Sequence, residues 1–306
     1  MTYGVVIPVH AADDGRVGYL QQSVRSVLAQ PDCVAVVVDD GSPKDLCLPS
    51  SPNLRIVRRE KAEGELKTAS IALNTGIDML LSGEVLTGAE RDDLTAVCYV
   101  HSDDYLTDNS LTNRGTVLSD ASPFVYSPML LIKNEHQGGI MMGNKNPAFF
   151  SFRGFPHHAS MWSASFLRQL RTYVQEKYDQ DGVFDRNIFA GEDRDVTLST
   201  MELLQTLDKT QHVLDMPTYC YRIHEASITG MNSLASRKSD EKFIDKKHGI
   251  PTLSRIVYPF LADLPWSLGA RCPEIVKKLL RPVRDGLRRK PISENPIQQT
   301  EIETIL

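Results

Sequence analysis

Short apolar runs alternate with helical patterns along the first third of this 306-residue chain. Two of the runs, GVVIPVH at 4–10 and CVAVVVDDGS at 33–42, are almost continuously apolar up to their polar ends. That composition is typical of a strand buried on both faces, because a strand with one solvated face alternates apolar and polar residues. NLRIVRR at 53–59 and TAVCYVH at 95–101 predict two further strands.

Apolar residues at helical spacing lie between the predicted strands. One set runs from Val17 to Leu28 and ends near Pro31, and a second runs from Leu66 to Leu80. Strands that alternate with helices form mostly parallel sheets with right-handed crossovers. We therefore expect an α/β fold with a mostly parallel central sheet flanked by helices.

The second half of the chain is less regular. FVYSPMLLIK at 124–133 predicts one strand, and the Gly- and Asn-rich stretch 136–148 predicts a loop or a hairpin tip. Apolar residues from Trp162 to Val174 predict a helix, and EDRDVTLSTMELLQTL at 192–207 predicts another.

Composition argues against several classes of protein. The net charge of −5 opposes nucleic-acid binding, which normally uses a basic face. No apolar stretch approaches the roughly 18–20 residues that span a bilayer, and the N-terminus enters a predicted strand without the features of a signal peptide. Five scattered cysteines without a C-x-x-C pair predict neither a disulfide framework nor a zinc site, and they fit a cytoplasmic protein.

Acidic pairs follow two of the predicted strands: Asp39–Asp40 after one and Asp103–Asp104, in YVHSDDYL, after another. In open parallel sheets, ligands bind at the carboxyl ends of the strands. Adjacent carboxylates beside buried apolar residues are costly unless a cation neutralises them, and a divalent ion that holds a diphosphate would do so. The ordinary alternatives are an Asp-Gly turn for the first pair and helix-capping acids for the second.

Two later segments carry further candidates. GEDRDVTLS places Glu192 and Asp193 at the start of a predicted helix, where a carboxylate can act as a general base or simply interact with the helix dipole. YRIHEASIT at 221–229 offers Arg222 for phosphate and His224 for metal, although a lone histidine is more often structural.

In their order and spacing, these motifs resemble glycosyltransferase family 2, the inverting enzymes with the GT-A fold, over roughly residues 3–230. VVIPVH, VVVDDGS and ASIALNTGID resemble the family's opening strand, its nucleotide-side motif and its xxARNxGI helix, and HSDD corresponds to its D-x-D-type metal motif. FPHHASMWSASFLRQL, GEDRDVTLS and YRIHEASIT resemble its H-x-S-x-M, EDxDLxxR and YRxHxxSxT segments. The chain departs from the pattern at His10, Leu73 and Ser199, which leaves the subfamily and donor open.

The resemblance implies roles for individual residues. Asp193 would be the catalytic base, and Asp40 would accept a hydrogen bond from the uracil N–H. Asp104 would be the stronger ligand for Mn²⁺ or Mg²⁺, with His224 as a further ligand and Asp103 beside the donor sugar. The other positions follow from their motifs: Pro8, Val9, Lys67 and Arg222 on the donor side, and His158, Trp162 and Glu192 on the acceptor side.

The implied reaction moves a sugar from a UDP-sugar to a hydroxyl group of a saccharide or lipid-linked acceptor, in bacterial polysaccharide, glycolipid or glycoconjugate synthesis. A sugar-1-phosphate nucleotidyltransferase is the nearest enzymatic alternative, but it would need a Gly-rich phosphate-binding loop where HAADDGR follows the first strand. A catalytically inactive nucleotide-sugar binding module is the alternative outside enzymes. A dinucleotide oxidoreductase is excluded, because no G-x-G-x-x-G follows the first strand.

The expected domains follow the motifs. Residues 1–230 would form the GT-A domain, with a nucleotide-binding half at 1–106 and an acceptor-binding half at 107–230. Residues 231–306 would form a partly helical, basic C-terminal extension.

The extension has an uneven charge. Residues 271–290 carry a net charge of +6, against −11 for the rest of the chain. This basic and apolar segment predicts either peripheral membrane contact at the inner face of the membrane or a helix packed on the acidic body. The polar tail after 291 is expected to be disordered, and the oligomeric state stays open, with a homodimer as one candidate.

Overall fold

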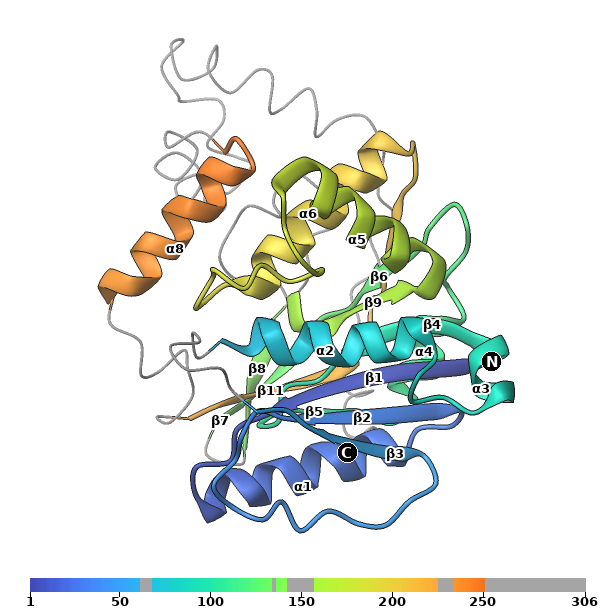
Figure 1. The fold of residues 1–306 in the computed structure, drawn as a ribbon, viewed down its shortest axis with the longest axis vertical. Helices are drawn as coiled ribbons and strands as arrows, with labels where there is room; N and C mark the ends of the chain where they lie inside the picture. The colour runs from blue at the N-terminus through green and yellow to red at the C-terminus, as the bar shows by residue number, and fades with distance from the viewer. Residues whose placement is uncertain (61–67, 134–135, 142–156, 225–233, 251–306) are drawn as a thin grey trace. The chain divides into compact units, whose positions relative to one another are not determined.

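The chain divides into two compact units, Met1–His248 and Gly249–Leu306. The first unit extends past the predicted boundary at residue 230, because helix α8 (Leu234–Lys247) belongs to it. The predictions for 271–290 and for the tail after 291 lie outside the described residues. The computed structural model, drawn in colour in Figure 1, describes residues 1–60, 68–133, 136–141, 157–224 and 234–250.

Seven strands form the main sheet, in the order β10-β6-β9-β4-β1-β2-β3. β1 is parallel to β2 and β4, and β2 is parallel to β3, whereas β9 runs antiparallel between β4 and β6. The predicted α/β fold with a mostly parallel sheet is therefore confirmed. The bounds are β1 Thr2–Val9, β2 Cys33–Asp39, β3 Leu54–Arg58, β4 Leu94–Tyr99, β6 Phe124–Tyr126, β9 Ser160–Ser163 and β10 Gln211–Val213.

A second sheet has the strand order β5-β11-β7-β8. The single strand expected over 124–133 is instead two strands, β6 and β7, which belong to different sheets and are separated by Pro128, a residue that cannot donate to a ladder. The loop or hairpin tip expected at 136–148 begins with a strand, β8, that pairs antiparallel with β7. The bounds are β5 Tyr105–Leu106, β7 Met129–Lys133, β8 His136–Met141 and β11 Tyr219–Ile223.

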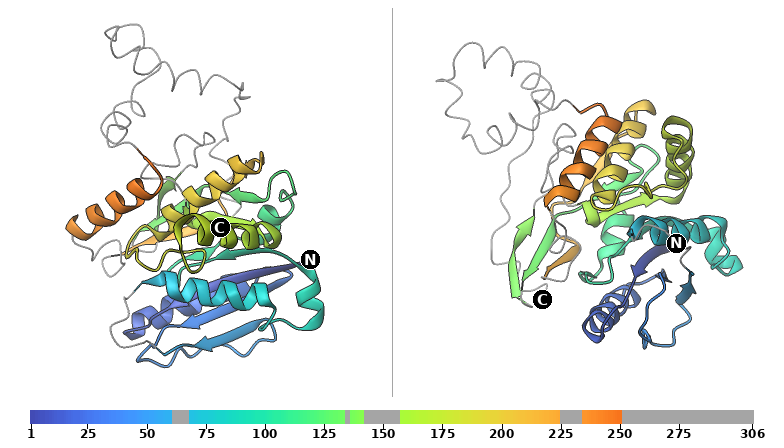
Figure 2. Two further views of the ribbon diagram at one scale, coloured as in Figure 1. Left: turned by 45° about the horizontal axis from the view of Figure 1, so that its top comes forward. Right: turned by 60° about the vertical axis from the view of Figure 1, so that its left-hand side comes forward.

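Helices cover both faces of the main sheet (Figures 1 and 2). Alternate residues of β1 serve opposite faces: Val5 and Ile7 join the apolar cluster formed with α1, whereas Val6 faces Gly76 of α2. A Cβ at Gly76 would lie 2.5 Å from Cγ1 of Val6, so glycine is what permits the close approach of this helix. The helices are α1 Asp14–Leu28, α2 Ala69–Ser82, α3 Gly88–Asp93, α4 Ser110–Gly115, α5 Ala164–Tyr178, α6 Glu192–Thr206 and α8 Leu234–Lys247.

Helix α5 lies beside α2 on the same face of the sheet, and an ion pair of 2.7 Å between Arg171 and Asp78 joins them. The helix expected from Trp162 starts two residues later, at Ala164, because Trp162 belongs to β9 and Ser163 caps α5 by accepting from the Phe166 N–H. Among the described residues, none of the helices combines the length and the apolar character that crossing a membrane requires.

Candidate active site

The carboxyl ends of β1, β2 and β4 meet at one edge of the main sheet, and polar residues follow each of them. Pro8 and Val9, predicted on the donor side, are buried at the end of β1. Pro8 lies beyond the last β1–β4 pair, Val6↔Tyr99, so its missing N–H interrupts no pairing with β4. The site candidates therefore begin where the pairing of β1 with β4 stops, while β1 still pairs with β2.

The first acidic pair divides into two roles. Asp39 accepts from the Ser42 N–H at 2.8 Å, so the turn alternative describes this residue. Asp40 is buried and paired with Arg59, and its backbone carbonyl lies 3.0 Å from Nδ1 of His10. Asp40 thus stays the candidate that could face a nucleotide base.

Asp104, the second acid of YVHSDDYL, is buried, with 1% of its surface exposed. Its Oδ2 accepts from the Tyr219 hydroxyl and its Oδ1 from the Arg222 backbone N–H, each at 2.7 Å. Burial and the neighbouring charge of Asp103 raise the pKa of Asp104 well above its ordinary value. Because metal ligands must be ionised and reachable, this environment opposes the predicted role of Asp104 as the stronger metal ligand.

Asp103 has the opposite surroundings, with 31% of its side chain exposed and Oδ2 2.9 Å from Nε2 of His224. Burial alone would raise the pKa of Asp103, but the hydrogen bond with His224 and the nearby imidazoles bring it below its ordinary value. The ring of His224 packs on Tyr19, at 5.2 Å between centroids. The structure therefore brings Asp103 and His224 together, and the order of the two acids as metal ligands stays a prediction. Neither acid caps α4, whose N-cap residue Asn109 makes no side-chain capping bond.

The guanidinium of Arg222 contacts other groups of the protein. Its Nη1 donates to the Asp103 carbonyl at 2.7 Å, it also bonds to Gln22, and its guanidinium lies 4.2 Å from the centre of the Tyr19 ring. Only 2% of its surface is exposed. These contacts correct the phosphate-binding role expected of Arg222, because the side chain already holds the loop that carries Asp103.

Glu192 and Asp193 begin α6, after Gly191 at a φ of 99°. Asp193 keeps 16% of its side chain exposed, and its Oδ2 lies 3.4 Å from Nε2 of His158. Glu192 is buried and accepts from the Gly191 N–H at 3.0 Å. Burial and the charge of Asp193 raise the pKa of Glu192 to about 8, so Glu192 keeps its proton at neutral pH and Asp193 is the better candidate base.

Two histidines connect this helix to the loop after β4. The rings of His101 and His158 meet edge to face at 4.7 Å, and burial lowers the pKa of both. In the described part of the chain, Nε2 of His101 is buried without a hydrogen-bond partner. His101 was not predicted as a site residue, although its position two residues before Asp103 in HSDD indicates that it lies near the acids.

Trp162 and Lys67 complete the predicted set. Trp162 is 1% exposed on β9, stacks with Tyr99 at 6.2 Å, and donates from Nε1 to Oγ1 of Thr200 at 3.0 Å. The acceptor role expected of Trp162 is wrong, because the indole is a satisfied core residue. Lys67 lies outside the described residues.

A metal ion would fit this site only if the protein and the substrate both supplied ligands to it. Within the described residues, no three His, Cys, Asp or Glu side chains gather to hold a metal. Asp103 and His224 supply one oxygen and one nitrogen ligand, and a divalent ion commonly takes its other ligands from substrate phosphates and water. The donor set therefore fits Mn²⁺ or Mg²⁺ bound together with a diphosphate.

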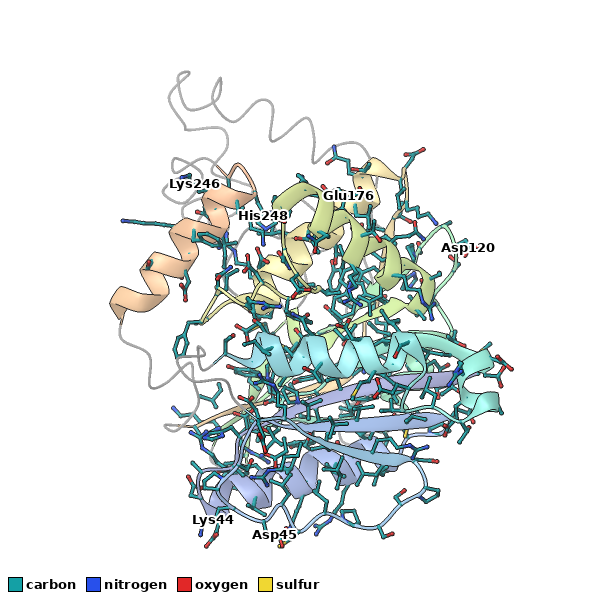
Figure 3. The ribbon with its side chains drawn as sticks, viewed as in Figure 1. Lys44, Asp45, Asp120, Glu176, Lys246 and His248 are labelled. Carbon is teal, nitrogen blue, oxygen red and sulfur yellow. The ribbon has the colours of Figure 1, made fainter. Side chains whose placement is uncertain are left out.

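A hollow of about 480 Å³ lies elsewhere, between the end of α5 and α8. It is lined by residues 178–181 and 185–187 and by Phe243, Lys246 and Lys247, of which Lys246 is labelled on α8 in Figure 3. None of the candidate site residues lines it, so the hollow and the site at the strand ends are separate features.

No protein-family model matches the chain, and no curated protein matches its sequence. Solved structures of S. aureus TarS 1–349 share its fold. The complex of TarS 1–349 with UDP-GlcNAc has a TM-score of 0.52 at 14% identity and covers 88% of this chain and 78% of that chain. A further TarS 1–349 structure and the complex with UDP each give a TM-score of 0.51 at 16% identity, covering 81% of this chain and 65% of that chain, just under two thirds.

Proposed function

We propose that this chain is an inverting GT-A glycosyltransferase of the family 2 type, which transfers a sugar from a UDP-sugar to an acceptor hydroxyl group. One observation carries the proposal: beyond the end of β4 in a mostly parallel sheet, His101, two residues before Asp103, meets the ring of His158, and His158 contacts Asp193 from a distant segment. Ligands of such sheets bind at that edge. The fold shared with TarS, whose structures hold UDP and UDP-GlcNAc, supports a nucleotide-sugar donor.

On the donor side, Asp40 would accept from the uracil N–H, and Asp103 with His224 would hold Mn²⁺ or Mg²⁺. A bound ion would neutralise the charge that develops on the UDP leaving group. The imidazole of His224 favours Mn²⁺ over Mg²⁺, because magnesium prefers oxygen ligands. Asp104 and Arg222 would keep Asp103 and His224 in register through the contacts described above.

On the acceptor side, Asp193 would remove the proton of the attacking hydroxyl group. The acceptor oxygen forms a bond to the anomeric carbon from the face opposite UDP, while the bond to the UDP oxygen breaks and UDP leaves with the electron pair. Attack from the opposite face inverts the configuration. The acceptor would be a saccharide or a lipid-linked sugar, consistent with a role in polysaccharide or glycolipid synthesis.

Calorimetric titration with UDP, with and without Mn²⁺, tests the donor side. We expect Mn²⁺ to strengthen UDP binding by the wild type, and Asp103→Asn to remove that gain. Asp104→Asn is the matched control: it changes a buried, hydrogen-bonded carboxyl, so it should lower thermal stability while leaving a gain from Mn²⁺. Equal UDP binding with and without the metal would contradict the metal role, and loss of the gain in Asp104→Asn alone would restore the original assignment.

Turnover distinguishes an enzyme from an inactive binding module. A panel of UDP-, GDP- and dTDP-sugars with Mn²⁺ should show slow release of UDP from one UDP-sugar even without acceptor. Failure of every nucleotide sugar to bind would overturn the proposed function, whereas binding without any release would indicate a binding module.

A further inference from the structure

His158 contacts Asp193, the candidate base, but the proposed reaction gives His158 no role. It lies in the short 3-10 helix η2 (His157–Ala159), which leads into β9 and packs against α6. Strand β9 is held on both sides, by β4 and by β6, so the backbone that carries His158 is fixed. The imidazole Nε2 then lies 3.4 Å from Oδ2 of Asp193.

Aromatic rings hold the imidazole of His158 in one plane. Tyr221 stacks on it at 5.2 Å with an interplanar angle of 17°, and Tyr219 lies nearly parallel to it at 6.1 Å. His101 meets it edge to face at 4.7 Å. Since the Tyr219 hydroxyl donates to Asp104, the stacking platform is itself anchored to the loop that carries the donor-side residues.

The surroundings also keep His158 uncharged. Burial and the neighbouring His101 hold the pKa of His158 well below its ordinary value, against the opposing charge of Asp103. A neutral imidazole that donates from Nε2 orients a carboxylate without neutralising it. A protonated histidine at the same place would form an ion pair and make Asp193 a weaker base.

We propose that His158 is a positioning residue for Asp193: its Nε2 lies 3.4 Å from Oδ2, and tightening of this contact to a hydrogen bond in the substrate complex would leave Oδ1 to take the proton of the acceptor hydroxyl group. The inference rests on the proposed function, because it assigns a partner to the base of that reaction. It adds a residue that acts through Asp193 and does not touch the substrate. The contact between His158 and Asp193 joins η2 to α6, which are separate elements of the predicted acceptor half.

Two substitutions at one position test the role. His158→Phe keeps an aromatic ring but removes the N–H donor. We expect kcat to fall about 10- to 100-fold, because small misplacements of reacting groups cause losses of that size. His158→Gln places an amide donor near the position of Nε2 and should restore most of kcat, while the KM for the UDP-sugar stays unchanged in both.

His212→Gln, on the exposed strand β10, is the control and should behave as wild type. A wild-type kcat in His158→Phe would overturn the inference. Equal losses of kcat in His158→Phe and His158→Gln would also overturn it, because they indicate a packing role alone. A wild type that releases no UDP from any UDP-sugar would instead contradict the proposed function, so the two failures are distinguishable.

Discussion

Helix α6 borders two buried clusters of titratable side chains that are built in opposite ways. We name the first the α6–α8 network, formed by Asp195, Glu202, Lys247 and His248, the last labelled in Figure 3. Nζ of Lys247 lies 2.8 Å from Asp195, and the two ring nitrogens of His248 each lie 2.9 Å from a carboxylate, one of Asp195 and one of Glu202. Each of these buried charges faces an opposite charge.

The candidate active site combines the Asp103–His224 contact with groups that are neutral or partly exposed. Burial keeps His101 and His158 neutral, Glu192 holds its proton, and Asp103 stays partly exposed. Structural charge clusters are compensated internally, because an uncompensated buried charge costs several kcal/mol. Groups left neutral or facing outward are the ones that a ligand can engage. The difference indicates which side chains of α6 serve function and which serve stability.

The largest expected effect is a loss of kcat from a change confined to the candidate active site. Asp193→Asn should lower kcat by ~10²–10⁴-fold, because an amide cannot accept the acceptor proton. Binding of UDP with Mn²⁺ and the thermal midpoint should stay near wild type, since the Asp193 carboxylate is partly exposed. Steady-state kinetics with calorimetry provide the measurement. Near-wild-type transfer by this variant would remove Asp193 as the base.

The same substitution two residues later should have the reverse outcome. Asp195→Asn leaves the ammonium of Lys247 and the imidazolium of His248 without their shared carboxylate, and breaking a buried pair costs roughly 3–5 kcal/mol. Urea unfolding should show that loss, while kcat per folded molecule changes little. Full stability in this variant would show that the α6–α8 network contributes nothing to folding.

The two clusters also predict how stability depends on pH. Burial alone would lower the pKa of His248, but its bonds to Asp195 and Glu202 raise it above its ordinary value. Its contribution to the free energy of unfolding is therefore fully present below about pH 6.5 and is lost as pH rises through the raised pKa. Glu192, raised to about 8, adds a loss of the same sign between about pH 4.5 and 8.

Thermal unfolding from pH 5 to 9 measures these contributions. His248→Gln should flatten the decline above pH 6.5, and Glu192→Gln should remove the part that ends near pH 8. Bonds to His248 and Tyr178 lower the pKa of Glu202 to about 2 despite its burial, so its contribution to stability is present above about pH 4.5 and is lost as the pH falls toward 2. An alkaline decline identical in both variants and the wild type would refute the assignment.

The smallest expected effect tests the correction at Trp162. Trp162→Phe removes the hydrogen bond to Thr200 and should cost about 1 kcal/mol of unfolding free energy. The acceptor KM should not change, because the indole lies in the core between β4 and β6. A large rise in the acceptor KM with unchanged stability would restore the acceptor role.

The sequence by itself determined the order of β1, α1, β2, β3, α2 and β4 and the placement of acids at the carboxyl ends of β2 and β4. Those features are local, because burial on two faces and helical spacing are written in neighbouring residues. The helix over 192–206 and its two leading acids were likewise predictable. The division of 124–133 between two sheets was not, because strand partners come from distant segments.

Only the tertiary structure decided what each polar side chain does. Asp103 and Asp104 are adjacent in sequence, but their surroundings differ. The hydroxyl of Tyr219, which is 115 residues away along the chain, donates its hydrogen bond to Asp104. Distant contacts likewise turn Arg222 inward and seat His158 beside Asp193. A side chain's pKa, exposure and partners depend on what the fold brings against it, and residue type and local spacing do not encode those neighbours.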